Sequence, residues 1–257
     1  MRAHLIDLSK WNQGFDLANI AAEDGAVVDG VILRSGYGLK PDRLFAAFVQ
    51  AAQPLPVRGA YHYYSSGSPW EAQAQFFLRQ VEGKGLHFYV LDFETAYNSK
   101  SAGFALGAQK WLEYVAARTG KKVLLYTNPS TYSEWLSTHG DWMAAWPLWI
   151  AQYPYPNWNE YLDRIRTQTT IQPWLPKGRR EWSLWQYSAD GNSKGAHFGV
   201  KSRHVDLNVF NGSVDELHKW AGVDQELDSE TPSSYPVTPV LDDMQAVIDR
   251  QRIGASP

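Results

Sequence analysis

The sequence predicts an α/β fold in which a mostly parallel sheet of about eight strands closes into a barrel. The first half of the 257-residue chain alternates short apolar runs with segments of helical periodicity, about five times. The second half adds about three strand-like runs without clear helices between them. Repeated β-α units build a parallel sheet covered by helices, and about eight strands can close it. An open doubly wound sheet is the alternative, although neither G-x-G-x-x-G nor a Walker-type loop follows the first strand.

The expected strands are apolar, β-branched or aromatic runs, and they cover residues 4–9, 31–35, 58–64, 87–94, 122–127, 147–153, 181–187 and 205–210. The expected helices show apolar residues three and four apart, with proline near their starts or a glycine such as Gly120 after their ends. They cover residues 15–22, 41–53, 69–81, 105–118, 130–136 and 214–220.

Two segments depart from this alternation. Residues 154–180 form a long insertion that contains Pro and Trp, with a short helix expected at 160–167; a loop of this length is usually functional or disordered. From about Val223 the chain becomes acidic and rich in Ser and Pro, which is typical of a linker. We therefore expect a folded domain over residues 1–222, followed by a linker and short tail over 223–257, where 240–253 has the pattern of a short amphipathic helix.

Composition argues against several classes of protein. The net charge is −3, and the only basic cluster is residues 177–180, so nothing predicts nucleic-acid binding. The chain has no Cys, which excludes disulfides and thiolate chemistry. No apolar run approaches a membrane-spanning length, and no basic-then-apolar leader follows Met1. Aromatic residues reach 14%, with 12 Trp, which suits a cleft for sugar rings, although most aromatics would simply fill the barrel.

The strand expected at 87–94 ends in two carboxylates, Asp92 and Glu94. Side chains alternate along a strand, so Asp92 and Glu94 share a face and Phe93 points the other way. The Cα atoms of the two acids would lie about 6.5–7 Å apart, which allows their carboxyl groups a similar separation. Acid pairs that cleave glycosidic bonds stand about 5–9 Å apart, and one member must hold its proton to a raised pH. The pattern therefore predicts a general acid and its partner. The alternative is an ordinary strand end whose acids lie at a solvated rim, cap a helix or form salt bridges.

Four acids are expected at the carboxyl ends of strands: Asp7, Asp92, Glu94 and Asp206. The carboxyl ends of barrel strands carry the active site in folds of this kind. A cluster of four carboxyls suits either hydrolysis of a glycosidic bond or binding of a hard cation such as Mg²⁺. Asp206 could instead serve as a turn or cap residue.

Seven motifs occur in an order that resembles glycoside hydrolase family 25, the Chalaropsis-type lysozymes or N-acetylmuramidases. The resemblance covers about residues 4–221 and implies a flattened, TIM-like barrel of five β-α units plus three strands. The motifs are Asp7-Leu8-Ser9, Gly59-Ala60-Tyr61-His62-Tyr63, Leu91-Asp92-Phe93-Glu94, Leu125-Tyr126-Thr127-Asn128, Leu148-Trp149-Ile150-Ala151-Gln152-Tyr153, Leu184-Trp185-Gln186-Tyr187 and Val205-Asp206-Leu207-Asn208.

The resemblance implies cleavage, with retention, of the β-1,4 bond between N-acetylmuramic acid and N-acetylglucosamine in peptidoglycan. Glu94 matches the general acid/base, and Asp92 matches either a nucleophile or the group that stabilises an oxazolinium formed by the substrate. Asp7 and Asp206 match flanking acids that orient this pair. The resemblance further implies that Tyr61, Tyr126, Trp149 and Tyr153 bind substrate, whereas we expect His62 to be structural.

The expected protein is thus a monomer that acts on bacterial peptidoglycan at the cell wall, with no cofactor, no metal, no nucleic acid and no membrane insertion. The sequence shows no leader after Met1, which favours a phage-lysin-like or non-classical route of release. The alternative is that the natural protein has a leader that this sequence does not include. The insertion and the lack of a recognisable wall-binding repeat depart from the expected pattern. Three alternatives remain: a hydrolase of chitin-like polymers, a non-catalytic glycan-binding or phage structural module, and a Mg²⁺-dependent hydrolase.

Overall fold

The structure is a computed structural model that describes residues 1–20, 26–94, 102–139, 142–153, 162–176 and 178–223. The chain divides into two units, Met1–Asp224 and Gln225–Pro257. The helix predicted at 240–253 lies outside the described residues. Everything below concerns the first unit.

Eight strands close into a barrel, which confirms the predicted fold class. Seven of them are parallel, and each pairs with the next in the order β1, β3, β5, β6, β7, β8, β9. Strand β11 closes the gap between β9 and β1 and runs antiparallel to both. The barrel strands are β1 (His4–Leu8), β3 (Gly30–Tyr37), β5 (Val57–Tyr63), β6 (Phe88–Asp92), β7 (Lys122–Thr127), β8 (Leu148–Ala151), β9 (Leu184–Ser188) and β11 (Asp206–Phe210). A two-residue strand, β4 (Lys40–Pro41), forms a hairpin with the end of β3.

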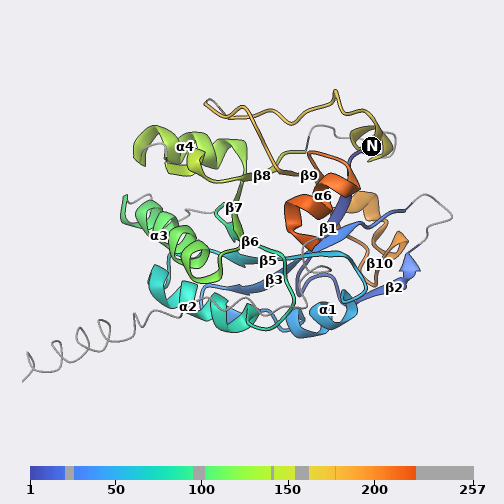
Figure 1. Cartoon of the computed structure of the whole chain (residues 1–257), viewed down its shortest axis with the longest axis horizontal. Coiled ribbons are helices and arrows are strands. Elements are labelled where there is room, and N and C mark those ends of the chain that lie inside the picture. Colours follow the sequence, from blue (N-terminus) through green and yellow to red (C-terminus); the bar gives the residue numbers. More distant parts are fainter. Residues whose placement is uncertain (21–25, 95–101, 140–141, 154–161, 177, 224–257) are drawn as a thin grey trace, which may run out of the picture. The chain divides into compact units, whose positions relative to one another are not determined.

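Helices cover the outside of the parallel strands. Figure 1 shows α1 (Phe45–Ala51), α2 (Trp70–Val81), α3 (Ala102–Thr119) and α4 (Pro129–His139) in succession around the side formed by β3 to β7. Helix α3 stops before Gly120, whose φ of +63° suits a helix end, as the sequence predicts. Helix α1 is shorter than predicted, because Pro41 belongs to β4 and the Asp42 carboxylate accepts a hydrogen bond from the Leu44 amide ahead of the helix. The insertion contains α5 (Leu162–Thr167), close to the predicted short helix.

The helix predicted over residues 15–22 is wrong. The chain there forms β2 (Phe15–Ile20), which pairs antiparallel with β10 (Phe198–Val200) in a separate two-stranded sheet. Phe15 is buried and Leu17 packs against the outer core. The local apolar spacing fits either element, and the partner strand that decides between them comes from the far end of the chain.

Two apolar cores result from the alternation of side chains along the barrel strands. The outward-facing residues pack under the helices, and the inward-facing residues fill the barrel, among them Leu5, Ile32, Phe88, Val90 and Leu124. Gly59 leaves room for this filling, because a Cβ atom there would lie 2.4 Å from the Phe88 ring. The barrel interior is therefore a packed core and not a channel.

Helix α6 (Val214–Ala221) packs against the barrel interior at the end where the parallel strands begin. Its Leu217 is fully buried, and its Trp220 ring lies 5.1 Å from Phe88 and 5.3 Å from Phe210. A capping box fixes its start: the Ser213 hydroxyl accepts from the Glu216 amide, and the Glu216 carboxylate accepts from the Ser213 amide. No helix within the described residues has the length and apolar character needed to cross a bilayer.

Candidate active site

The four predicted acids meet in one pocket of about 280 Å³ where the parallel strands end. Asp7 comes from β1, Asp92 ends β6, and Glu94 follows two residues later. Asp206 was expected at the carboxyl end of a strand, and that placement is wrong: it begins β11. Because β11 is antiparallel, its first residue reaches the same end of the barrel, opposite Asp7.

Asp92 and Glu94 share a face, as predicted, although β6 itself ends at Asp92. The Phe93 amide donates to the Tyr126 carbonyl at 2.9 Å, which continues the strand-like path by one residue. The Phe93 ring packs outward against Tyr64 and Phe104, at centroid distances of 6.3 and 5.4 Å. Packing of this ring in the outer core therefore directs the two flanking carboxyls into the pocket.

Asp7 is held by two amide side chains, one from the adjacent strand β11 and one from β9, the next strand beyond it. Its Oδ2 atom accepts from Gln186 Nε2 at 2.8 Å and from Asn208 Nδ2 at 2.9 Å. Gln186 also lies 3.5 Å from Asp206 Oδ2. The Asp7 carboxyl is almost fully buried, so these donors replace the water that an exposed carboxylate would have.

Aromatic side chains orient the two amides. Tyr126 and Tyr153 donate from their hydroxyls to Gln186 Oε1, at 2.8 and 2.7 Å. Trp149 donates from Nε1 to Asn208 Oδ1 at 2.9 Å. Each amide oxygen is thereby occupied, so each amide nitrogen faces Asp7. The network fixes which atoms of Gln186 and Asn208 point at the acid.

Burial raises the pKa of both Asp7 and Asp206. The shift is larger for Asp206, where the charge of Asp7 and a hydrogen bond to Asp7 act in the same direction as burial. For Asp7, hydrogen bonds from Asn208, Gln186 and Asp206 oppose the effect of burial on the pKa. The pair therefore holds one proton on Asp206 and leaves the charge on Asp7.

Burial also raises the pKa of Asp92 and Glu94. The pKa of Asp92 lies well above its usual value, and the charges of Glu94 and Asp7 add to the effect of burial. The pKa of Glu94 is raised by burial and by Asp7. Asp92 Oδ1 is buried and has no hydrogen-bond partner among the described residues. The two carboxyls thus keep protons at a pH where isolated carboxyls are ionised, and Asp92 lacks the donors that would stabilise its anion.

Three of the four predicted cleft aromatics line the pocket. Tyr61, Tyr126 and Trp149 extend inward from β5, β7 and β8 and form its floor, and Trp149 is only 1% exposed. Tyr153 lines a neighbouring groove and is 48% exposed. His62 points away, into the outer core, where it stacks on Trp111 at 5.7 Å. Burial lowers the pKa of His62 to about 4, so this side chain is a neutral structural residue.

The acid pocket adjoins a hollow on each side. A groove of about 670 Å³ shares Glu94 with it, and its lining includes Gln152, Tyr153 and Trp174. On the other side a hollow of about 430 Å³ shares Trp11, Arg34 and Tyr63 with it. The three hollows form one cleft with the acids in the middle. Trp174 belongs to the insertion, so the insertion contributes this side chain to the cleft.

Comparison with known proteins identifies the family. A model described as Glycosyl hydrolases family 25 matches residues 6–196. The chain belongs to glycosyl hydrolase family 25. This membership confirms the resemblance predicted from the motifs.

Individual relatives of this family 25 chain agree with the assignment. Lysozyme M1 of Streptomyces globisporus is 29% identical over 230 residues, which cover 82% of this chain and 69% of the relative. The uncharacterized protein YegX of Escherichia coli O6:H1 is 28% identical over 219 residues, covering 83% and 71%. Among solved structures, a bacterial lysozyme from Streptomyces coelicolor superimposes with a TM-score of 0.64 at 26% identity, covering 86% and 97%. A family 25 glycosyl hydrolase from Bacillus anthracis gives 0.66 at 22% identity, covering 85% and 93%.

Sequence reasoning missed several residues of this family 25 site. Gln186 and Asn208 lie inside two of the family motifs. Each is two residues from an inward-facing residue of its strand, Leu184 and Phe210 respectively, so strand alternation could have predicted that both side chains point into the barrel. Arg34 of β3 is likewise two residues from the inward-facing Ile32. Trp11 and Trp174 lie in loops, where no periodicity indicates a direction. Within the described part of the chain, no group of three or more His, Asp or Glu has a geometry that could hold a metal ion.

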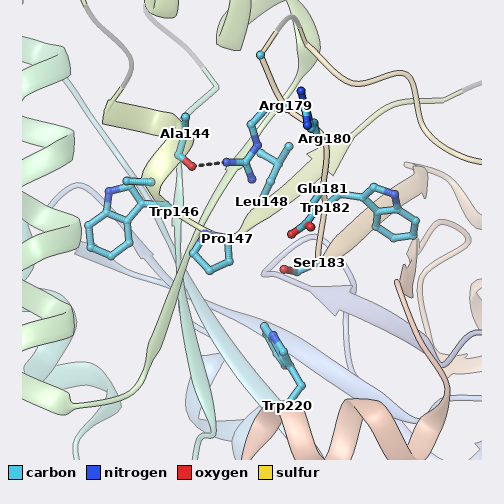
Figure 2. Close-up of a pocket in the computed structure, with 12 residues that line it drawn as sticks. Ala144, Trp146, Pro147, Leu148, Arg179, Arg180, Glu181, Trp182, Ser183 and Trp220 are labelled. Atoms are coloured by element: carbon cyan, nitrogen blue, oxygen red, sulfur yellow. Dashed lines mark hydrogen bonds between the residues drawn. The ribbon is translucent and has the colours of Figure 1, made fainter.

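A different hollow, of about 490 Å³, lies where β8 and β9 begin, at the opposite end of the barrel from the acids. Figure 2 shows Arg179 on one side of this hollow and Trp220 of α6 across from it, with Pro147 and Ser183 between. Arg179 donates to the Ala144 carbonyl at 2.7 Å. Glu181 is the single acid among the described residues that line it, so these residues do not supply the carboxyl pair that the cleft contains.

Proposed function

We propose that this chain is a lysozyme that hydrolyses the β-1,4 bond between N-acetylmuramic acid and N-acetylglucosamine, with retention. The observation that carries the proposal is the carboxyl pair of buried Asp92 and partly exposed Glu94 in the middle of a long aromatic cleft. Membership of family 25 and the lysozymes among the relatives support the same reaction at the level of the family. The alternatives of a chitin hydrolase and a non-catalytic module become outcomes of the test.

In the first step, Glu94 gives its proton to the glycosidic oxygen while the bond from this oxygen to C1 of the muramic residue breaks. The oxygen of the substrate's acetamido group closes on C1 and forms an oxazolinium. Asp92 is ionised in this step: when the substrate binds, its acetamido N–H donates to the unpartnered Oδ1 atom, which lowers the pKa of Asp92, and the Asp92 proton leaves to solvent before the glycosidic bond breaks. Direct attack by Asp92 on C1 is the other route to retention; the empty acceptor on Asp92 favours assistance by the substrate.

In the second step, ionised Glu94 accepts a proton from water, and the water oxygen bonds to C1 as the oxazolinium opens. Attack from the side that the leaving group occupied retains the configuration. Asp7 and Asp206 stay in place: protonated Asp206 donates a hydrogen bond to Asp7, and the anion on Asp7 keeps the pKa of Glu94 raised, so that Glu94 is protonated before the reaction. We propose that the protein works at the bacterial wall as a monomer, in the manner of a phage endolysin or a secreted lysozyme.

The decisive experiment is digestion of purified peptidoglycan by wild type and by Glu94→Gln, followed by borohydride reduction and mass spectrometry. We expect reduced N-acetylmuramic acid at the new ends and a loss of at least about 100-fold in rate for Glu94→Gln, the usual scale for a general acid. Glu82→Gln makes the same change at an exposed residue that ends α2, and it should retain full activity. Thermal melting shows whether each variant is folded.

Other results would change the assignment. Reduced N-acetylglucosamine at the ends would keep the hydrolase but overturn the bond. Cleavage of chitin oligomers without cleavage of peptidoglycan would favour the chitin hydrolase. Loss of activity in EDTA, with recovery on adding Mg²⁺, would favour the metal-dependent reaction. A folded wild type that cleaves none of these polymers would favour the binding module.

A further inference from the structure

The hollow beside β4 carries an excess of positive charge, which the described residues of the other two hollows of the cleft do not. We call it the cationic arm; its lining includes Lys10, Trp11, Arg34, Tyr37, Lys40 and Tyr63. It opens directly into the acid pocket, with which it shares Trp11, Arg34 and Tyr63. Its position makes it part of the surface that a bound glycan would follow.

The two lysines supply the free charge. Arg34 Nε lies 2.8 Å from Asp42 Oδ2, and Asp42 is buried, so that pair is neutral. Lys10 and Lys40 are exposed, and no carboxylate of the described residues lies within salt-bridge distance of either. Lys10 Nζ instead lies 4.9 Å from the centre of the Trp11 ring. The arm therefore presents two unpaired cations to whatever enters it.

Aromatic rings surround these cations. Tyr37 and Tyr63 stack at 4.6 Å, and Tyr37 is half exposed. Trp11 is 71% exposed, which is unusual for a side chain of this size. The arm thus combines flat apolar surface with charge, a combination that suits a sugar bearing an anionic substituent.

The opposite arm of the cleft differs in chemistry. Apart from Glu94, the residues described along its lining are neutral: Asn128, Ser130, Ser133, Gln152, Tyr153 and Trp174 provide amides, hydroxyls and an exposed indole. A ligand with identical groups at both ends would gain nothing from this difference. A ligand that carries anions on one side of the cleavage point would be oriented by it.

We infer that the cationic arm binds the carboxylates attached to muramic acid in the wall glycan: those of the peptide stem where a stem is attached, and the lactyl carboxylate where it is not. The inference deepens the proposed function and rests on it. Muramic acid carries these carboxylates, whereas N-acetylglucosamine carries none. The acid pocket by itself repels an anionic polymer, and Lys10 and Lys40 offset this repulsion on one side.

The test compares kcat and KM on native peptidoglycan and on peptidoglycan whose carboxylates have been amidated with carbodiimide and an amine. Lys40→Glu and Lys40→Gln should raise KM on the native polymer, by about two- to fivefold for each unit of charge removed, the scale of exposed ion pairs. Lys40→Arg should keep the wild-type KM. On the amidated polymer the differences among these variants should disappear, and raising the salt concentration should shrink them on the native polymer.

Arg180→Glu is the matched control, because it reverses one exposed charge at the opposite end of the barrel (Figure 2). It should leave the ratio of kcat/KM for native and amidated polymer at the wild-type value. An amidase cuts the amide bond between the lactyl carbonyl and the stem, so it replaces the stem carboxylates with a freed lactyl carboxylate: loss of the Lys40 effect shows that the arm requires the stem, and persistence shows that the lactyl carboxylate is bound in its place.

Two outcomes would overturn the inference. One is an equal effect of Lys40→Glu on native and amidated polymer. The other is an effect that disappears when hydrofluoric acid removes phosphate-linked polymers while the carboxylates remain, which would assign the arm to phosphate. Failure of the proposed function is recognised separately, because a folded wild type would then cleave neither form of peptidoglycan.

Discussion

At the scale of single residues, Asp7 connects all parts of the acid pocket. It is the buried anion that two amides hold, and its charge contributes to the raised pKa of Asp92, Glu94 and Asp206. Burying a charge is unfavourable unless donors surround it, and Gln186 and Asn208 supply them. A charge held in this way tunes the neighbouring acids without touching the scissile bond.

Asp7→Asn should shift the pH profile. Removal of the negative charge lowers the pKa of Glu94, whose proton the first step requires. The general acid is then lost at a lower pH, so the alkaline limb of kcat/KM moves toward acid. The rate at the new optimum should fall less than in Glu94→Gln, because the asparagine oxygen can take the place of Oδ2 and still accept from both amides. Measurement of kcat/KM between about pH 3 and 9 tests this.

The exposed Asp215 of α6 provides the control: Asp215→Asn removes one negative charge far from the cleft and should leave the profile in place. An alkaline limb that stays still in Asp7→Asn, or moves toward higher pH, would contradict the role given to Asp7.

Sequence reasoning found the acids but not the residues that hold them. The alternation along 87–94 was sufficient to pair Asp92 with Glu94, because both signals lie within a few residues. The partners of Asp7 come from β9 and β11, about 180 and 200 positions along the chain. Their amides carry no charge and no motif chemistry, so only the register of the closed barrel brings them to Asp7.

At the scale of elements, Gly59 shows how one strand depends on its neighbour. It lies in β5 next to Phe88 of β6, and a Cβ there would overlap the phenyl ring at 2.4 Å. Gly59→Ala should therefore lower the free energy of unfolding by about 1–3 kcal/mol, the usual cost of overpacking a core. Urea or thermal unfolding of the isolated variant measures the loss.

A second substitution separates this overlap from a general effect on the strand. Phe88→Leu removes ring volume and by itself creates a cavity. In the double variant the methyl group added at position 59 occupies part of that cavity. The loss of unfolding free energy in the double variant should therefore be smaller than the sum of the losses in the two single variants. Additive losses would mean that the ring is not what the glycine accommodates.

The direction of a strand is harder to predict than its existence. The run at 205–210 was predicted as a strand, yet Asp206 proved to begin an antiparallel strand instead of ending a parallel one. The chain between β9 and β11 holds β10 but no crossover helix, and it is this connection that reverses the direction. The error left the site intact, because the start of an antiparallel strand and the end of a parallel one reach the same rim.

At the scale of the whole molecule, the two ends of the barrel have different tasks. One end is polar and open to the cleft, and the other is covered by α6, whose Leu217 and Trp220 pack on the interior core. The first unit therefore needs α6 for its apolar core but, by our domain prediction, nothing after it. The predicted boundary at residue 222 can be refined slightly, since Val223 also packs against this core.

Two truncations test this division. A chain that ends at Asp224 should melt within about 2 °C of the full chain, because composition predicts that the removed segment is a linker and tail, and it should give the same fragments from soluble glycan. A chain that ends at Gly212 loses α6 and exposes the interior core, so it should aggregate or melt without a cooperative transition. Leu217→Ala is the milder version; it keeps the helix but should lower the free energy of unfolding by about 2–5 kcal/mol, the range for a large-to-small change in a core.

A stable chain ending at Gly212 would show that the barrel base closes without α6. A marked loss of melting temperature in the chain ending at Asp224 would place part of the folded domain beyond the predicted boundary.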